Sequence, residues 1–273
     1  MKKDNKDKTS FGFKEVDSDE KASLVGNVFD TVSENYDLMN DLMSFGIHRL
    51  WKKVTIETSG IKENFKVLDL AGGTGDMVKL MRDKVSPEKG MLILSDINAS
   101  MLNEGRNRLI DEGIENIQTA QIDAQFLPFR DNTFDLITIA FGLRNVTHKE
   151  KALESINKAL KPGGKLIILE FSRPQNEVFR EIYDLFSFEV IPKIGEFIAQ
   201  TEESYRYLAE SIRMHPTQEE LKEMLEDSGF TKCKYENLTN GVVAIHSGQK
   251  GMIDVWRRPK TYKNLTYFAE SSH

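Results

Sequence analysis

Two kinds of hydrophobic pattern follow one another along the chain. Between residues 21 and 60, apolar side chains such as Val25, Val28 and Phe29 recur at helical spacing and predict helices. From residue 66, short apolar runs alternate with amphipathic segments. Strands are predicted over 66–70, 91–96, 117–122, 134–141 and 165–171, with helices over 76–84, 98–110 and 149–160. This alternation indicates right-handed βαβ units and a mostly parallel, doubly wound sheet with helices on both faces.

The C-terminal third departs from this rhythm. Residues 176–215 are aromatic-rich and read as a helical insert, and a helix over 217–228 follows. Apolar runs over 231–237 and 242–246 flank Asn240-Gly241, a pair typical of hairpins, so the sheet should end in an antiparallel C-terminal hairpin. The pattern therefore predicts one α/β domain over 21–249 with helical additions. Residues 1–20 are predicted to be a flexible leader, and 251–273 form a tail of unassigned role.

Composition and charge narrow the class of protein. The 273 residues carry a formal charge of −6, which argues against a general nucleic-acid binder. A single cysteine, Cys233, excludes an internal disulfide and a multi-cysteine zinc site, and the five histidines show no metal-ligand spacing. The charged N-terminus lacks the apolar stretch of a signal peptide, and no apolar run approaches the roughly 20 residues of a membrane span. We expect a soluble, cytoplasmic protein.

A glycine-rich turn lies between the first predicted strand and its helix. It contains Gly72, Gly73, Thr74 and Gly75, where the backbone can approach a ligand and a helix N-terminus offers free N–H groups. A dinucleotide fingerprint would need a third glycine where Val78 stands, and the Lys-Ser/Thr of a P-loop is absent. The turn instead fits S-adenosylmethionine-dependent methyltransferases, whose ligand has no pyrophosphate.

Two carboxylates follow the next strands. Asp96 ends the strand after the glycine turn, where a carboxylate takes both hydroxyls of a ribose; alternatively, it merely caps the next helix. Asp123 and Ala124 follow the third strand, where an adenine pocket is expected, and Asp123 could accept from the exocyclic amine. A solvated turn is an equal alternative for this pair.

Longer stretches of the chain resemble the ubiquinone/menaquinone biosynthesis C-methyltransferases of the UbiE type, over roughly residues 11 to 249. The matching stretches are 36–51 (YDLMNDLMSFGIHRLW), 68–76 (LDLAGGTGD), 141–146 (FGLRNV), 160–164 (LKPGG), 169–172 (LEFS), 204–212 (SYRYLAESI), and 237–244 around NLT and GVVA. The resemblance implies a seven-stranded class I methyltransferase fold, and S-adenosylmethionine bound by Thr74, Asp96 and the Asp123-Ala124 pair. It also implies methyl transfer to a ring carbon of a polyprenylated benzoquinol, a demethylmenaquinol or both. Many relatives have Asn at position 123, and Ser where this chain has Ala140.

Carbon methylation of a quinol requires the enzyme to position two reactants and to stabilise a developing phenolate. Arg144 and Asn145 follow the fourth strand of the sheet, and we expect Arg144 to stabilise the oxyanion and Asn145 to orient the acceptor. The alternative is that Arg144 pairs with a carboxylate on a helix for structural reasons. The candidates for the general base are His48, Asp37 and His215, each of which could instead pack or cap, and a water held by Arg144 could do the same job.

The role of the apolar insert and the identity of the acceptor each have more than one interpretation. Residues 178–198 form either a buried helical cap or a lid that accepts an isoprenoid tail, with at most peripheral contact to the inner face of the cytoplasmic membrane. A homodimer and a quinone-biosynthesis complex are further partners to test. The competing functions are a methyltransferase for another small apolar acceptor and a non-catalytic cofactor-binding subunit.

Overall fold

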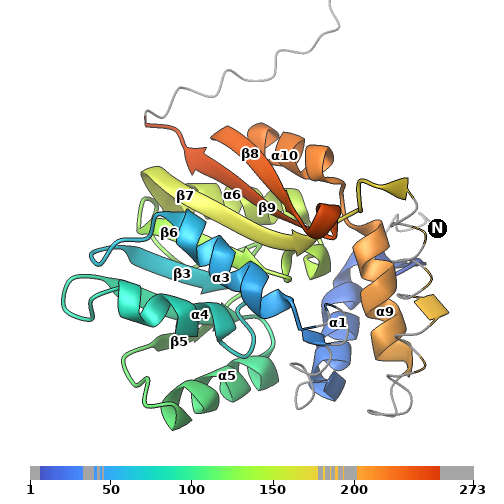
Figure 1. Ribbon diagram of the computed structural model, residues 1–273, viewed down its shortest axis with the longest axis horizontal. Coiled ribbons are helices and arrows are strands. Elements are labelled where there is room, and N and C mark those ends of the chain that lie inside the picture. The colour runs from blue at the N-terminus through green and yellow to red at the C-terminus, as the bar shows by residue number, and fades with distance from the viewer. Residues whose placement is uncertain are drawn as a thin grey trace, which may run out of the picture.

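The computed structural model describes residues 7–32, 40–41, 44, 46–177, 181, 185, 188–189, 193 and 202–252. Within these residues, seven strands form one sheet in the order β5-β4-β3-β6-β7-β9-β8 (Figure 1). Their bounds are β3 Lys66–Leu70, β4 Met91–Asp96, β5 Gln118–Gln121, β6 Phe134–Ala140, β7 Leu160–Phe171, β8 Phe230–Leu238 and β9 Val243–Lys250. The pairs from β5 to β7 are parallel, and β9 is antiparallel to both β7 and β8. The predicted mostly parallel sheet with an antiparallel C-terminal hairpin is confirmed.

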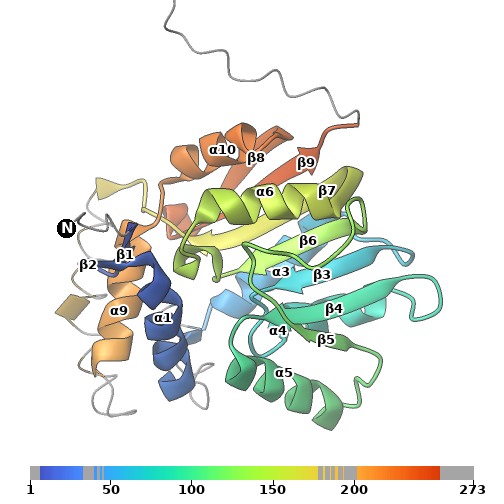
Figure 2. The same ribbon diagram turned by 180° about the vertical axis from the view of Figure 1, so that it is seen from behind.

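Helices cover both faces of this sheet. On the face seen in Figure 1 lie α3 (His48–Ser59), α4 (Asp76–Met81) with the short η2 (Arg82–Lys84), and α5 (Ala99–Asp111). On the opposite face, seen in Figure 2, lie α6 (Lys149–Ala159) and α10 (Gln218–Asp227). Two short 3-10 turns complete the sheet's connections. The first, η3 (Leu143–Asn145), follows β6, and the second, η5 (Thr239–Gly241), joins β8 to β9.

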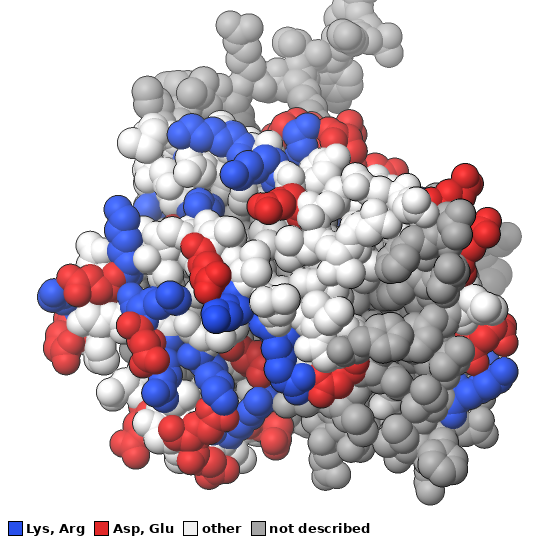
Figure 3. Space-filling model, viewed as in Figure 1, with Lys and Arg blue, Asp and Glu red and all other residues white. Residues whose placement is uncertain are grey.

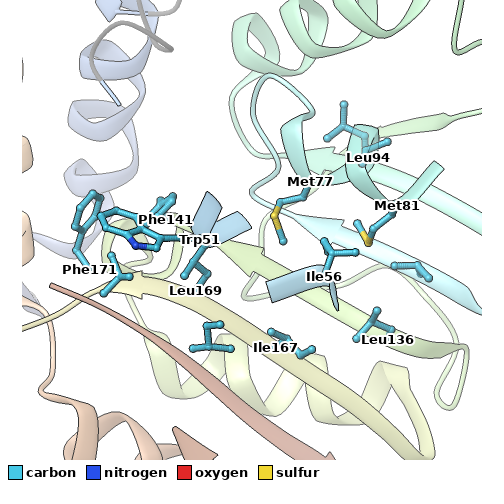
Figure 4. Packing of buried hydrophobic residues seen from close by; sticks show 14 of the residues in the cluster. Trp51, Ile56, Met77, Met81, Leu94, Leu136, Phe141, Ile167, Leu169 and Phe171 are labelled. Carbon is cyan, nitrogen blue, oxygen red and sulfur yellow. The ribbon is translucent and has the colours of Figure 1, made fainter. Parts of the chain in front are cut away.

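Each face of the sheet packs its own hydrophobic core because successive side chains of a strand point to opposite sides. In Figure 4, Ile56 of α3 and Met77 and Met81 of α4 lie over the strands, with Leu136 and Ile167 beneath. On the far side, Leu153 and Ile156 of α6 pack with Leu166 and Ile168, which alternate with the residues of the first core. Strands buried on both sides are what the apolar runs of the sequence predict.

Ion pairs join α3, α4 and α5 to one another. Asp76 at the start of α4 pairs with Lys52 of α3 at 2.7 Å and with Arg108 of α5 at 3.1 Å, and Lys79 pairs with Glu112. Acidic and basic side chains are accordingly intermixed over these helices in Figure 3.

Two further helices, α1 (Ser18–Val32) and α9 (Glu202–Met214), lie side by side beyond the carboxyl ends of the central strands (Figures 1 and 2). The antiparallel strands β1 (Lys8–Phe11) and β2 (Lys14–Asp17) precede α1. The prediction of a flexible leader over 1–20 is therefore wrong for residues 8–20. Gly12, with φ +57°, makes the tight turn, and the Phe11 ring stacks on Tyr207 of α9 with centroids 4.2 Å apart.

Two other sequence expectations change or lie outside the described part of the chain. Strand β7 begins at Leu160, five residues before the predicted start, because Leu160 pairs with Phe134 before a register shift. Of the insert over 176–215, α9 is described, whereas most of 178–201 and the tail from 253 onward are outside the described residues. Across the described residues, no helix has the length and apolar character to span a membrane, and no cluster of His, Cys, Asp and Glu could hold a metal.

Candidate active site

A hollow of about 810 Å³, counting the space at its mouth, lies at the carboxyl ends of β3, β4, β5 and β6. Residues from the turns after all four strands line one side of it, and residues of α1 line the other. They are Ala22, Val25, Gly26, Phe29, Leu70, Ala71, Gly73, Asp96, Ile97, Asn98, Met101, Ile122, Asp123, Ala124, Gln125, Phe141, Gly142, Asn145, Val146 and Thr147. Ligands of open α/β sheets bind at this edge.

The glycine turn brings its backbone against its neighbours more closely than a side chain would permit. A Cβ at Gly72 would lie 2.5 Å from Oδ2 of Asp69, and a Cβ at Gly105 of α5 would lie closer than 3.0 Å to the Gly73 carbonyl. Gly75, with φ +84°, is the N-cap of α4. Gly73 lines the hollow, whereas Gly72, Thr74 (5% exposed) and Gly75 are not among the residues that line it.

Asp96 has its carboxylate fixed by two backbone amides. Its Oδ2 accepts from the Gly73 N–H at 2.9 Å, and its Oδ1 accepts from the Asn98 N–H at 2.9 Å. Asn98, not Asp96, caps α5, because its side chain accepts from Met101 N at 2.8 Å. Each Asp96 oxygen keeps a lone pair for a further donor, which suits the two hydroxyls of a ribose. Burial raises the pKa of Asp96.

Asp123 and Ala124 line the same hollow beyond Asp96. Asp123 is a turn acceptor: its Oδ1 takes the Gln125 backbone N–H at 2.9 Å and the Gln125 Nε2 at 3.1 Å. Gln125 in turn accepts the His148 N–H at 3.2 Å through its Oε1. The turn-stabilising role and a place in the hollow's wall are thus compatible for Asp123.

Arg144 is buried, and its guanidinium already has partners within the protein. Its Nη1 donates to Glu170 Oε1 at 2.8 Å and also to the Phe141 carbonyl, and both side chains of the ion pair are 1% exposed. The guanidinium carbon lies 5.6 Å from the centroid of the Phe171 ring. The partner carboxylate comes from the neighbouring strand β7, not from a helix. The guanidinium thereby holds the turn after β6 against the end of β7.

Asn145, in contrast, lines the hollow. The hydroxyl of Tyr207 on α9 donates to Asn145 Oδ1 at 3.0 Å. Burial raises the pKa of Tyr207, so the phenol remains a donor. Because Oδ1 is occupied, the two N–H donors of the Asn145 amide are the groups left for a ligand.

The candidates for the general base are placed apart from this wall. His48 is 1% exposed, its Nε2 is 2.9 Å from Asp41 Oδ1, and burial lowers its pKa. His215 is 4% exposed, burial holds its pKa well below the usual range, and neither ring nitrogen has a hydrogen-bond partner among the described residues. Neither histidine is among the residues that line the hollow, and Asp37 is outside the described residues.

Sequence reasoning missed the wall contributed by α1. Asn98 donates from Nδ2 to the Gly26 carbonyl at 3.3 Å and to Asp30 Oδ1 at 2.9 Å, which ties α1 to the turn after β4. The helical spacing of apolar residues over 21–32 predicts a helix, and the structure adds that part of this helix lines the hollow. Glu170 and Tyr207, the partners of Arg144 and Asn145, were missed as well.

The family to which the chain belongs follows from comparison with known proteins. The model of the ubiE/COQ5 methyltransferase family matches residues 15–250. Two curated relatives, both called ubiquinone/menaquinone biosynthesis C-methyltransferase UbiE, come from Teredinibacter turnerae and Shewanella baltica. They are 58% and 57% identical over 243 residues, covering 89% of this chain and 97% and 96% of the relatives.

Solved structures are similar in fold. A SAM-dependent methyltransferase from Aquifex aeolicus has a TM-score of 0.56 at 19% identity, over 77% of this chain and 96% of its own. A SAM-dependent methyltransferase from Thermotoga maritima, described as a possible histamine N-methyltransferase, also has a TM-score of 0.56, at 18% identity over 82% and 98%. With the resemblance in fold and the match in sequence, the chain belongs to the ubiE/COQ5 methyltransferase family.

Proposed function

We propose that this protein transfers the methyl group of S-adenosylmethionine to a ring carbon of a polyprenylated benzoquinol, a demethylmenaquinol or both. Family membership and the names of the curated relatives support this reaction class. The observation that carries it is that Asp96 and Asn145 line one hollow, so a ribose-binding carboxylate and an amide donor face the same space.

The cofactor fits the wall formed by the turns after β3, β4 and β5. Asp96 would hold the ribose hydroxyls, the Gly73 backbone would approach the amino-acid part, and Asp123 and Ala124 would contact the adenine, with Thr74 supporting the turn. Because residues 72 and 105 are glycines, the turn packs closely against Asp69 and against α5, which holds the Gly73 backbone in the place that this arrangement needs. When bound, S-adenosylmethionine supplies an electrophilic methyl group on a sulfonium.

The acceptor is positioned by the turn after β6. Asn145 donates to the ring oxygen on which negative charge develops, and Tyr207 fixes the amide in the orientation that presents its N–H groups. Arg144 adds positive charge behind this turn but, being paired with Glu170, acts by holding Asn145 in place. His48 and His215 stay candidates for proton transfer only through intervening water, and Asp37, which is outside the described residues, stays a candidate.

The experiment that tests this function uses the purified full chain with methyl-labelled S-adenosylmethionine and a short-chain demethylated quinol kept reduced. The expected product is the quinol that carries one additional ring methyl, identified by mass. Asn145→Ala should lower turnover by roughly 100-fold, the size of one lost oxyanion donor, with cofactor affinity unchanged. A protein that binds cofactor yet methylates no quinol would exclude the proposal and favour another acceptor or a non-catalytic role.

Peripheral membrane contact is a further part of this proposal, because polyprenylated quinols reside in the bilayer. Phe13 at the tip of the N-terminal hairpin is 60% exposed, Leu185 is 63% exposed and Met214 is 48% exposed. The Phe13 ring lies 5.9 Å from that of Phe188, so hairpin and insert meet at this surface. Phe13→Ser should reduce flotation with anionic liposomes; equal flotation of variant and wild type would refute the contact.

Self-association and membership of a quinone-biosynthesis complex are proposals of the same kind. Light scattering on the purified chain distinguishes a monomer from a homodimer. Co-purification of the tagged chain with other quinone-synthesis enzymes tests the complex.

A further inference from the structure

The N-terminal hairpin of β1 and β2 is docked on α9 through its tight turn (Figure 2). Gly12, in that turn, is buried with φ +57°, and a Cβ there would collide with the Glu210 carboxylate of α9. The next residue, Phe13, donates its backbone N–H to that carboxylate at 3.0 Å. A side chain at position 12 would displace the carboxylate from this bond, so the turn and Glu210 fit each other only with glycine.

Tyr207, one turn before Glu210 on α9, is covered by the aromatic ring of the hairpin. The Phe11 ring stacks on the Tyr207 ring with centroids 4.2 Å apart and planes 20° apart. Tyr207 is 4% exposed, and Phe11 packs with it against the hydrophobic core that contains Trp51 and Phe171 (Figure 4). A ring held between a stacked partner and a close-packed core has little room to move. The hairpin therefore helps to fix the position of Tyr207.

The hydroxyl of Tyr207 holds the amide that the turn after β6 presents to the hollow. It donates to Asn145 Oδ1 at 3.0 Å, and Asn145 lines the hollow. Burial raises the pKa of Tyr207, so the phenol keeps the proton that this bond requires. Without the bond, the amide could turn over and present its oxygen, an acceptor, where a phenolate needs a donor. The orientation of Asn145 thus depends on the placement of the Tyr207 ring.

A second contact joins the N-terminal segment to the same wall of the hollow. Asp7, the residue before β1, has its Oδ2 3.7 Å from His148 Nε2, and its carbonyl accepts the Ser18 N–H at 2.9 Å. His148 directly follows Thr147 of the wall and donates its N–H to Gln125, another lining residue. The contact between Asp7 and His148 is partly exposed and contributes little energy. It nevertheless places the start of the hairpin beside the acceptor side of the hollow.

We propose that the N-terminal hairpin is a positioning element of the methyl transfer, in which Phe11 holds Tyr207 and Tyr207 holds the Asn145 amide toward the acceptor. This inference rests on the methyl transfer proposed above. Phe11 and Tyr207 are positioning residues, because neither is among the residues that line the hollow and both act through Asn145. The hairpin thereby has a task in the chemical step that is separate from the membrane contact proposed for Phe13.

The test compares Phe11→Leu, Tyr207→Phe and the double variant with Lys14→Ala, an exposed position of the same hairpin that serves as the matched control. Cofactor dissociation constant, kcat, KM and urea unfolding are measured on the full chain, with a short-chain demethylated quinol kept reduced in solution and no membrane present. We expect kcat to fall about 10-fold in each single variant, with cofactor affinity and KM within about twofold, because a catalytic group misplaced by about 1 Å can cost up to about 100-fold. The control should keep the wild-type kcat.

The double variant separates positioning from a general loss of structure. If Phe11 acts through the Tyr207 hydroxyl, Phe11→Leu should lower kcat no further once that hydroxyl is gone, and the same should hold in an Asn145→Ala background. The proposal is overturned if the two losses multiply in the double variant, if either single variant keeps the wild-type kcat, or if the fall in kcat equals the unfolded fraction of the variant. If the wild-type chain methylates no quinol, the proposed function fails and this inference falls with it; an active wild type beside unaffected variants overturns this inference alone.

Discussion

Asp69 lies buried beneath the glycine turn, and its protonation should set how the stability of this protein depends on pH. Its Oδ1 accepts from Thr138 Oγ1 at 2.6 Å, and its Oδ2 has no hydrogen-bond partner among the described residues. Burial raises the pKa of Asp69 to about 7, although the Thr138 hydroxyl and the Lys52 ammonium act in the opposite direction. In the unfolded chain, an aspartate has a pKa near 3.9.

The sign follows from proton binding. Above pH 4, the unfolded state has released the Asp69 proton while the folded state retains it, so stability falls as pH rises until the folded group has also ionised near pH 7. The whole difference is roughly 4 kcal/mol, at 1.36 kcal/mol for each pH unit between the two pKa values. About 1.5 kcal/mol of this has accumulated by pH 5, which leaves about 3 kcal/mol between pH 5 and pH 8.

Asp69→Asn isolates this contribution, because the amide keeps an acceptor for Thr138 and does not titrate. Urea unfolding of the cofactor-free protein at pH 5 and pH 8 gives the free energy of unfolding for each. The wild type should lose about 3 kcal/mol more than Asp69→Asn over this interval. Asp131→Asn, at an exposed position, is the control and should follow the wild type. Equal losses in wild type and Asp69→Asn would refute the assignment of a neutral carboxyl at neutral pH.

Three further predictions concern the walls of the hollow. Glu170→Ala leaves Arg144 buried without its carboxylate and should cost about 3–5 kcal/mol in urea unfolding, more than the double Arg144→Ala/Glu170→Ala variant costs. Gly105→Ala forces a Cβ against the Gly73 carbonyl and should weaken cofactor binding by about 1–3 kcal/mol in titration calorimetry. Asn98→Ala removes the cap of α5 and both bonds to α1, so unfolding should become easier by about 1 kcal/mol and cofactor affinity should also fall.

The central strands could be predicted from the sequence because they are buried on both faces. The apolar run 66–70 coincides with β3, and the run 134–141 exceeds β6 by one residue. Every second side chain of β7 belongs to one core and the alternate ones to the other, so no polar face interrupts the signal. The glycine turn could also be recognised in the sequence, because its positive φ angles and its close contacts admit few residues other than glycine.

The N-terminal hairpin could not be predicted, because what stabilises it lies far along the chain. Phe11 stacks on Tyr207, and the Phe13 N–H donates to Glu210, 197 residues away. The local composition of residues 8–17 is charged and resembles that of an unstructured end. Only the tight turn at Gly12 is a local signal, and alone it is weak.

The role of Arg144 shows a similar limit. Its position at the carboxyl edge of the sheet follows from the strand pattern, and the structure confirms that position. Its partner Glu170 stands 26 residues later on the neighbouring strand, so nothing in the local sequence reveals that the guanidinium is already paired. The order in which strands pair determines which side chains meet at this edge of the sheet. The role of Arg144 could therefore be judged only once the structure showed that β7 lies beside β6.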